Sequence, residues 1–159
     1  MLLAGRGGMR TELLIAVVLL PLIVFGCDEA TVELQLAAYD GTTIVPIEEG
    51  SSLHIVQGAQ GGTWIMPALQ LRGLGSPCRL ALSLDTPDEE IGALELEALY
   101  LQPLPDSWFR ADPYLPVGDP LDPSSVEHLF GQPATLAVSL EDADGRGISA
   151  SVGVVLAGW

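Results

Sequence analysis

The chain lacks lysine and asparagine, and six arginines stand against 21 acidic residues. The absence of asparagine removes every Asn-linked glycosylation acceptor and leaves the turns to Asp, Gly, Pro and Ser. The formal net charge of −15 excludes nucleic acid as a partner, because phosphate contacts require clustered Lys and Arg. The same charge works against the chain lying flat on an anionic membrane.

Cysteine is also scarce, with Cys27 and Cys78 as the two examples in 159 residues. A domain of this length buries about two-thirds of its unfolded surface, which is enough for one core without disulfides. Cys78 lies in the run 77–82 and is predicted to be a small apolar residue of a strand. A reactive thiol or an intermolecular bridge is the alternative for this residue.

The longest hydrophobic run lies near the start of the chain. Arg6 and Arg10 precede thirteen apolar residues, 13–25. A positive segment followed by an apolar stretch of about 7–15 residues is typical of a secretory signal, whereas a membrane span needs about 18 or more. The alternatives are an uncut short anchor and a cut elsewhere. Initiation at Met9 gives the same signal in a shorter form.

A processing motif ends this segment, where Val24 stands three positions before Cys27 and Gly26 directly precedes it. The motif resembles the lipobox of bacterial lipoproteins. The resemblance implies cleavage before Cys27, acylation at that residue and anchoring in the bacterial cell envelope, in either membrane. Several acyl chains give a stable anchor, since each buried CH₂ contributes about 0.8 kcal/mol. We expect the signal helix over 1–26 to be removed, which leaves a mature chain of net charge −16 with a lipidated N-terminus and linker over 27–30 and one domain over 31–159.

The rest of the sequence is patterned for β-strands. Apolar and polar residues alternate over 31–39, as a half-buried strand requires. The segment 91–101 is rich in helix-favouring Ala, Leu and Glu, but its partial alternation and its strand neighbours lead us to expect a strand. Tight turns are predicted at Asp40-Gly41 and Asp144-Gly145. Further strands are predicted over 42–47, with Pro46 indicating an edge, and over 53–57, 63–71, 79–84, 134–140 and 147–156.

Residues 102–124 interrupt this pattern because they hold six of the twelve prolines. Proline removes backbone donors that a sheet needs, so we expect a long loop here. A short helix capped by Ser124 or Ser125 is predicted to follow and to end at Phe130. The short strands and frequent turn signals predict an all-β fold, an antiparallel β-sandwich with an immunoglobulin-like closing hairpin. That architecture carries no function with it.

An internal segment, 46–74, carries a second resemblance. It contains the turn Gly58-Ala59-Gln60-Gly61-Gly62 between two predicted strands, followed by Arg72-Gly73-Leu74. The segment is similar to uncharacterised bacterial envelope lipoproteins with a Gly-x-Gln-Gly-Gly turn, which implies location and fold but no activity. The glycines allow positive φ, and the Gln60 amide can bond the turn backbone. The alternative is that Gln60 and Trp64 contact a ligand at the end of the sandwich.

No catalytic motif is found in the chain, which has no Gly-x-Ser-x-Gly elbow, no His-Glu-x-x-His, no phosphate loop and no Cys-x-x-Cys pair. The two histidines, His54 and His128, are both expected at the surface. Glu95 and Glu97 share a strand face, yet nothing isolates them from water for acid catalysis. We therefore expect that the protein is not an enzyme.

Calcium is the metal ion for which the sequence offers most ligands, since it takes about six to eight oxygens. Neither of the two acidic groups has EF-hand spacing, and the run 142–145 is equally typical of a plain hairpin turn. No other cofactor is expected. The two groups are Asp106, Asp112, Asp119 and Asp122 in the Pro-rich segment, and Glu141, Asp142 and Asp144 at the last hairpin.

The segment 102–124 also carries Trp108, Phe109 and Tyr114, three of the nine aromatic residues. These side chains either cover the open end of the sandwich or form an exposed platform for a sugar ring or a peptide. The expected function is that of a lipid-anchored envelope lipoprotein, a non-enzymatic interaction or structural module with an envelope protein or glycan as partner. The alternative is a Ca²⁺- or carbohydrate-binding domain that uses this segment.

Overall fold

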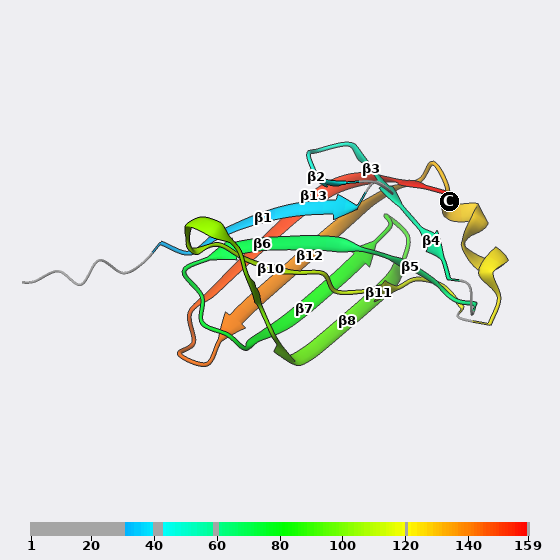
Figure 1. The fold of residues 1–159 in the computed structure, drawn as a ribbon. Coiled ribbons are helices and arrows are strands. Elements are labelled where there is room, and N and C mark those ends of the chain that lie inside the picture. Colours follow the sequence, from blue (N-terminus) through cyan, green and yellow to red (C-terminus); the bar gives the residue numbers. More distant parts are fainter. Residues whose placement is uncertain (1–30, 40–42, 59–60, 120, 159) are drawn as a thin grey trace, which may run out of the picture.

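A computed structural model of the chain describes residues 31–39, 43–58, 61–119 and 121–158 (Figure 1). The predicted signal helix, Cys27 and Gln60 lie outside these residues. The described part is all-β, as predicted, with strands in three sheets and two short 3₁₀ helices. No helix of this part is long and apolar enough to cross a membrane.

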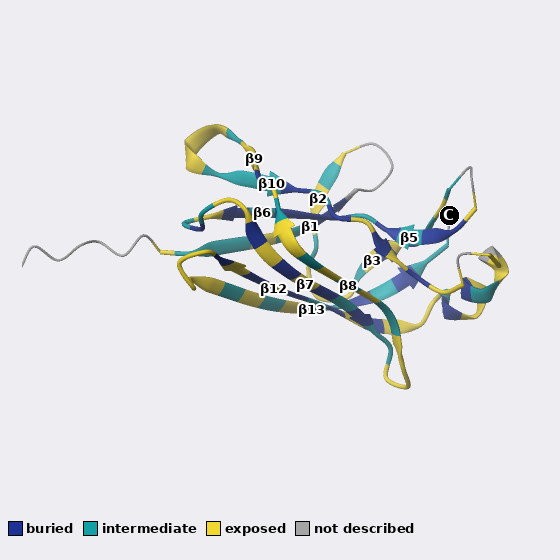
Figure 2. Ribbon diagram, turned by 90° about the horizontal axis from the view of Figure 1, so that it is seen from below, coloured by how far each residue is buried: buried dark blue, intermediate teal, exposed yellow. Residues whose placement is uncertain are grey.

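Two five-stranded sheets face each other as two layers (Figure 2). The first consists, in order, of β2 (Ile44–Pro46), β1 (Glu33–Tyr39), β6 (Pro67–Arg72), β10 (Phe109–Ala111) and β9 (Gln102–Pro103). The second consists of β3 (Ser51–His54), β13 (Gly147–Ala157), β12 (Pro133–Asp142), β7 (Cys78–Asp85) and β8 (Glu90–Leu99). A third, small sheet consists of β11 (Leu115–Pro116), β5 (Thr63–Ile65) and β4 (Val56–Gln57).

The core lies between the two layers and is built from alternate positions of the strands. In β7 every second residue is buried, and Leu80 and Leu84 are inaccessible to solvent. β12 alternates in the same way, with Leu136 and Leu140 turned inward. Burial of each such side chain contributes about 1.5–3 kcal/mol, so this two-residue period holds the layers together.

The ambiguous segment 91–101 forms most of β8, which confirms the predicted strand. It pairs antiparallel with β7, and Leu94 lies opposite Leu82. The helical propensity of the segment is overruled because β7 supplies partners for its backbone N–H and C=O groups. Glu95 and Glu97 are exposed on the outer side of this strand, as expected.

One strand pair departs from the predicted antiparallel pattern among the described residues. β13 is antiparallel to β12 but parallel to β3, with Val154 opposite Ser51. The chain reaches β3 from β2, a strand of the other sheet, through a turn in which Ser51 N donates to Glu48 O at 2.9 Å. A strand that arrives by such a crossover is not held to the antiparallel direction of a hairpin.

The segment 102–124 is not the uninterrupted loop that its prolines predict. It contains β9, the 3₁₀ helix η1 (Pro105–Ser107), β10 and β11. β10 has no proline and pairs with β6 along its whole length. Pro103 and Pro116 lie in two-residue strands at the ends of their sheets, where one side of a strand needs no backbone donor. Proline therefore marks sheet edges here, and pairing continues between them.

The predicted short helix is present as a 3₁₀ helix, η2 (Pro123–Leu129), but Asp122 caps it in place of Ser124 or Ser125. Asp122 Oδ1 accepts a hydrogen bond from Ser124 N at 3.1 Å. Proline at the first helical position has no N–H to satisfy, so the residue before it is the natural cap.

Candidate functional site

A hollow of about 250 Å³ opens on the face of the first sheet that points away from the core. Its most polar side consists of Arg110 from β10 and Asp112 just beyond that strand. The remaining lining residues are Tyr114, Ile44, Met66 and Ala68. Two residues predicted as site residues from the sequence, Asp112 and Tyr114, are thus brought together here. The hollow is the candidate site.

Arg110 and Asp112 form an ion pair within the hollow, with 2.7 Å between Arg110 Nε and Asp112 Oδ1. Residues two apart on an extended chain project from the same face, which places these side chains together. They expose 34% and 31% of their surface, so the pair is partly shielded from water. The remaining guanidinium N–H groups and carboxylate lone pairs offer donors beside acceptors. Such a pair suits a neutral polar ligand.

Tyr114 stands nearly perpendicular to Trp64, with 6.2 Å between the ring centroids and an interplanar angle of 84°. β11 begins directly after Tyr114 and pairs with β5, and Pro116 lies opposite Trp64. This pairing brings the two rings together from distant parts of the chain. Tyr114 nevertheless keeps 58% of its surface exposed. The edge-to-face contact therefore orients an aromatic ring that stays accessible.

Trp64 itself packs over the backbone of Gly58. A Cβ atom at position 58 would lie 2.0 Å from the nearest indole carbon, so only glycine fits beneath the ring. Within the described residues the buried Nε1 of Trp64 has no hydrogen-bond partner. Gln60, predicted to act together with Trp64, lies outside the described residues. Trp64 thus packs closely on Gly58 and in turn holds the ring of Tyr114 in position.

Two small residues give the outer face its depth. Ala37 and Ala68 lie opposite each other on β1 and β6, outside the core cluster. They expose only 4% and 2% of their surface, because larger neighbours on the same face shade their methyl groups. A smaller hollow of about 50 Å³ shares Ile44 with the first and is lined by Gln35, Leu36, Ala37, Ile44, Pro46 and Gln70.

Three polar residues of this face were not predicted as site residues from the sequence. Gln70 lies opposite Gln35 on one side and opposite Arg110 on the other, so the three form a row across β1, β6 and β10. Gln35 and Gln70 lie in predicted strands, where alternation marks a polar face, whereas Arg110 lies in the segment predicted as a loop and had no such signal. Alternation says nothing of which strands are neighbours.

Trp108 lies at the other end of the same sheet. The guanidinium carbon of Arg72 is 5.1 Å from the centroid of the Trp108 ring, and Arg72 also pairs with Glu33 at the start of β1. Trp108 is half-buried in this arrangement. The structure therefore does not bring Trp108 and Tyr114 into one platform, because β10 runs along the sheet between them.

The acidic residues predicted as calcium ligands take part in separate local hydrogen bonds. Asp112 binds Arg110, Asp122 caps η2, and Asp119 Oδ1 accepts from Leu121 N at 2.8 Å. Within the described ranges, no group of three or more His, Cys, Asp or Glu is placed to hold a metal ion. Asp119 and Asp122 thus bind the backbone of their own segment, and Asp112 binds the Arg110 side chain.

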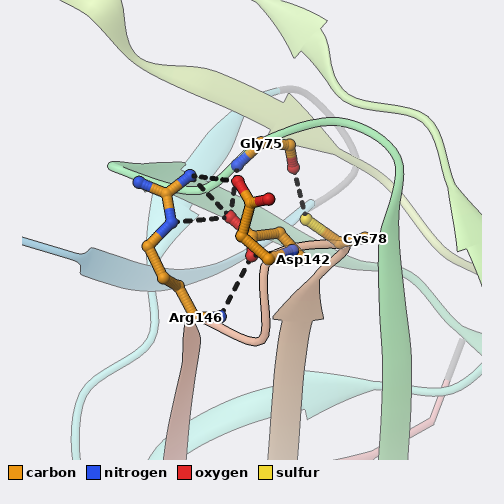
Figure 3. Close-up of polar contacts among 5 residues, drawn as sticks. Gly75, Cys78, Asp142 and Arg146 are labelled. Carbon is orange, nitrogen blue, oxygen red and sulfur yellow. Dashed lines mark hydrogen bonds and ion pairs between the residues drawn. The ribbon is translucent and has the colours of Figure 1, made fainter.

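Asp142 and Asp144 lie in the last hairpin, and Asp142 is enclosed, with 2% of its side chain exposed. Its Oδ1 accepts from the backbone N–H groups of Asp144 and Arg146, each at 3.0 Å (Figure 3). Its Oδ2 accepts from Gly75 N at 2.9 Å and from Arg146 Nε at 3.0 Å. These donors, the Gly75 amide foremost, hold the pKa of Asp142 below its ordinary value.

Cys78 lies beside this carboxylate and is 1% exposed, in agreement with the prediction of an apolar strand residue. Its Sγ donates to Gly75 O at 2.9 Å. Burial raises the pKa of the Cys78 thiol, and the neighbouring Asp142 charge raises it further. The thiol is therefore kept protonated and out of reach of solvent.

The remaining titratable candidates stay at the surface. His54 and His128 are exposed, as predicted, and neither lines the hollow. The His54 Nδ1 lies 3.2 Å from Gly158 O. Glu97 is bound to Arg79, with 3.3 Å between Oε2 and Nε, on the outer face of the second sheet.

Comparison with known proteins adds no family to this description. No protein-family model matches the chain, and no curated protein matches it. The function is therefore inferred from the hollow, its position in the fold and the segment that precedes the domain.

Proposed function

We propose that this protein is a lipid-anchored, non-enzymatic interaction domain of the bacterial cell envelope. Arg6, Arg10 and the apolar run 13–25 support export, and the motif ending at Cys27 supports an acyl anchor. The domain that follows presents a partly enclosed, polar and aromatic hollow to its surroundings. A surface hollow with an aromatic ring, hydrogen-bond donors and acceptors supplies the groups that bind a partner.

The domain is proposed to be an immunoglobulin-like β-sandwich, and the strand order supports this. The order β1-β6-β10-β9 corresponds to strands A, B, E and D of an immunoglobulin sheet. The order β13-β12-β7-β8 corresponds to strands G, F and C with one added strand, as in variable-type domains. β2, β3 and the small sheet of β4, β5 and β11 are additions to that plan.

The observation that carries the proposal is that the chain enters the domain at the start of β1, after the segment with the predicted anchor, whereas the hollow lies toward the other end of that strand. β1 begins at Glu33, six residues after Cys27, and an extended chain of that length spans at most about 20 Å. The hollow lies toward the other end of the strand, where Ala37 pairs with Ala68. A domain tethered in this way keeps one end near the membrane and turns the hollow away from it.

The anchor is tested by fractionation and crosslinking of the full-length protein in its native envelope, with a Cys27→Ser form as the control. We expect the wild type to remain with the membranes and to crosslink to one dominant component, identified by mass spectrometry. The Cys27→Ser form has no cysteine to acylate at that position, so it should no longer fractionate with the membranes and should lose that crosslink. Equal partition and equal crosslinking of the two forms would contradict the proposal.

A further inference from the structure

We infer that the hollow beside Tyr114 binds a pyranose ring of a neutral glycan, an inference that rests on the proposed function of the domain. The hollow combines an accessible aromatic ring with a partly shielded ion pair, and its lining includes the small residue Ala68. Each of these features matches one property of a sugar ring. The negative net charge of the chain then favours neutral glycans over anionic ones.

The aromatic ring supplies the apolar contact. A pyranose has an apolar face of C–H groups, which packs against an accessible aromatic side chain as other apolar groups do. Tyr114 is 58% exposed while Trp64 holds it edge to face. The tyrosine therefore need not be reordered when a ligand binds, which lowers the entropic cost of association.

The ion pair and the amides supply the polar contacts. Each sugar hydroxyl donates one hydrogen bond and accepts others, so it needs donors beside acceptors. Arg110 and Asp112 provide both within one partly shielded pair. Gln70 and Gln35 continue the row toward the smaller hollow, whose position fits a second ring of the same chain. A glycan chain thus matches the face better than a single sugar.

Charge and topology exclude the main competitors. The net charge of −15 repels an anionic glycan, and Asp112 already compensates the charge of Arg110. A peptide that adds as a strand needs a free sheet edge. The central strands β1 and β6 are paired on both sides, and the edge strand β2 contributes only Ile44 to the lining, so most of the hollow lies on the face of the sheet. A neutral ligand lying on the face of the sheet remains.

Affinity electrophoresis of the full-length protein in detergent tests the inference, with gels containing neutral glucan, mannan, xylan or soluble chitin, or anionic alginate. We expect at least one neutral polysaccharide to retard the wild type. Tyr114→Ala and Arg110→Gln should weaken that retardation at least tenfold, and Tyr114→Phe should keep it. Tyr100→Ala is the matched control, because Tyr100 is 75% exposed and lies outside the hollow. Circular dichroism of each variant checks that the fold is intact.

The inference is overturned by no retardation by any neutral polysaccharide, by retardation by alginate alone, or by equal losses in Tyr114→Ala and Tyr100→Ala. Crosslinks from position 114 to a peptide, without any retardation, would assign the hollow to a protein partner and also overturn it. Failure of the proposed anchor can be distinguished from failure of the glycan site. Retardation of a protein that does not fractionate with membranes would support the glycan site and contradict the anchored domain.

Discussion

The carboxylate of Asp142 accepts a hydrogen bond from the backbone amide of Gly75, 67 positions away in the chain, at 2.9 Å. The same carboxylate also accepts hydrogen bonds from the backbone N–H and the guanidinium of Arg146 (Figure 3). One side chain therefore closes the β12–β13 turn and fastens it to the connection between β6 and β7. Because β6 and β7 belong to different sheets, this contact ties the two layers at one end.

We expect Asp142→Asn to lower the melting temperature by several degrees. An amide offers one acceptor oxygen, and its NH₂ group would face the donors that now bind the second carboxylate oxygen. Thermal unfolding followed by circular dichroism measures the change. Asp144→Asn is the control, because the Asp144 side chain is 81% exposed. Equal melting temperatures for wild type and Asp142→Asn would contradict the role given to this carboxylate.

The contribution of Asp142 to the stability of the fold should also depend on pH. The pKa of Asp142 lies below its ordinary value of 3.8 in the folded state, so its contribution is complete above that value. It is lost as the pH falls through the lowered folded-state pKa. The difference in stability between wild type and Asp142→Asn should therefore shrink below pH 3.8. A difference that stays constant across acid urea titrations would refute the linkage.

Cys78 should react slowly with thiol reagents in the native protein. Its side chain is buried, and burial together with the Asp142 charge raises the pKa of the thiol. In a Cys27→Ser background it is the remaining cysteine, so labelling by iodoacetamide reports on it alone. Labelling should become fast in denaturant. Native labelling at the rate of a free thiol would show that the site opens readily.

Gly58→Ala should displace Trp64 and destabilise the domain by about 1–3 kcal/mol, as overpacking of a tight contact does. The added Cβ would lie 2.0 Å from the nearest indole carbon, so the indole must shift, which disturbs its edge-to-face contact with Tyr114. Tryptophan fluorescence and urea unfolding measure the two effects. Gly75→Ala is the matched control, since its Cβ would meet its nearest neighbour at 3.5 Å. Similar costs for both variants would contradict the tight packing of Trp64.

Chelation should leave the melting curve unchanged. The carboxylates of Asp112, Asp119, Asp122 and Asp142 already accept from protein donors. A calcium ion would have to replace those bonds, so it gains little on binding. Calorimetry with EDTA and with added Ca²⁺ tests this. A rise in melting temperature with Ca²⁺ would restore the cation site predicted from the sequence.

The candidate site was predictable only in part. Tyr114 and Asp112 stood out because aromatics and acids are conspicuous in a proline-rich segment. Ala37 and Ala68 did not, because an alanine in a strand has no local signal for lying at the bottom of a hollow. Whether such an alanine lies in a hollow depends on the size of the neighbouring side chains on other strands, which are far away in sequence. Trp108 and Tyr114 are close in sequence, yet the course of β10 separates them.

The sequence by itself determined the β class of the domain, the strands over 79–84 and 134–140 and the choice of strand over helix for most of 91–101. These properties follow from a two-residue period of hydrophobicity that a single strand already displays. The signal and the anchor at Cys27 stay predictions. Only the tertiary structure decided that the proline-rich segment contributes paired strands, that Asp142 fastens two sheets, and that Arg110, Asp112 and Tyr114 share a hollow. Strand neighbours are chosen by the packing of the whole core and by backbone partners distant in sequence, which no local pattern records.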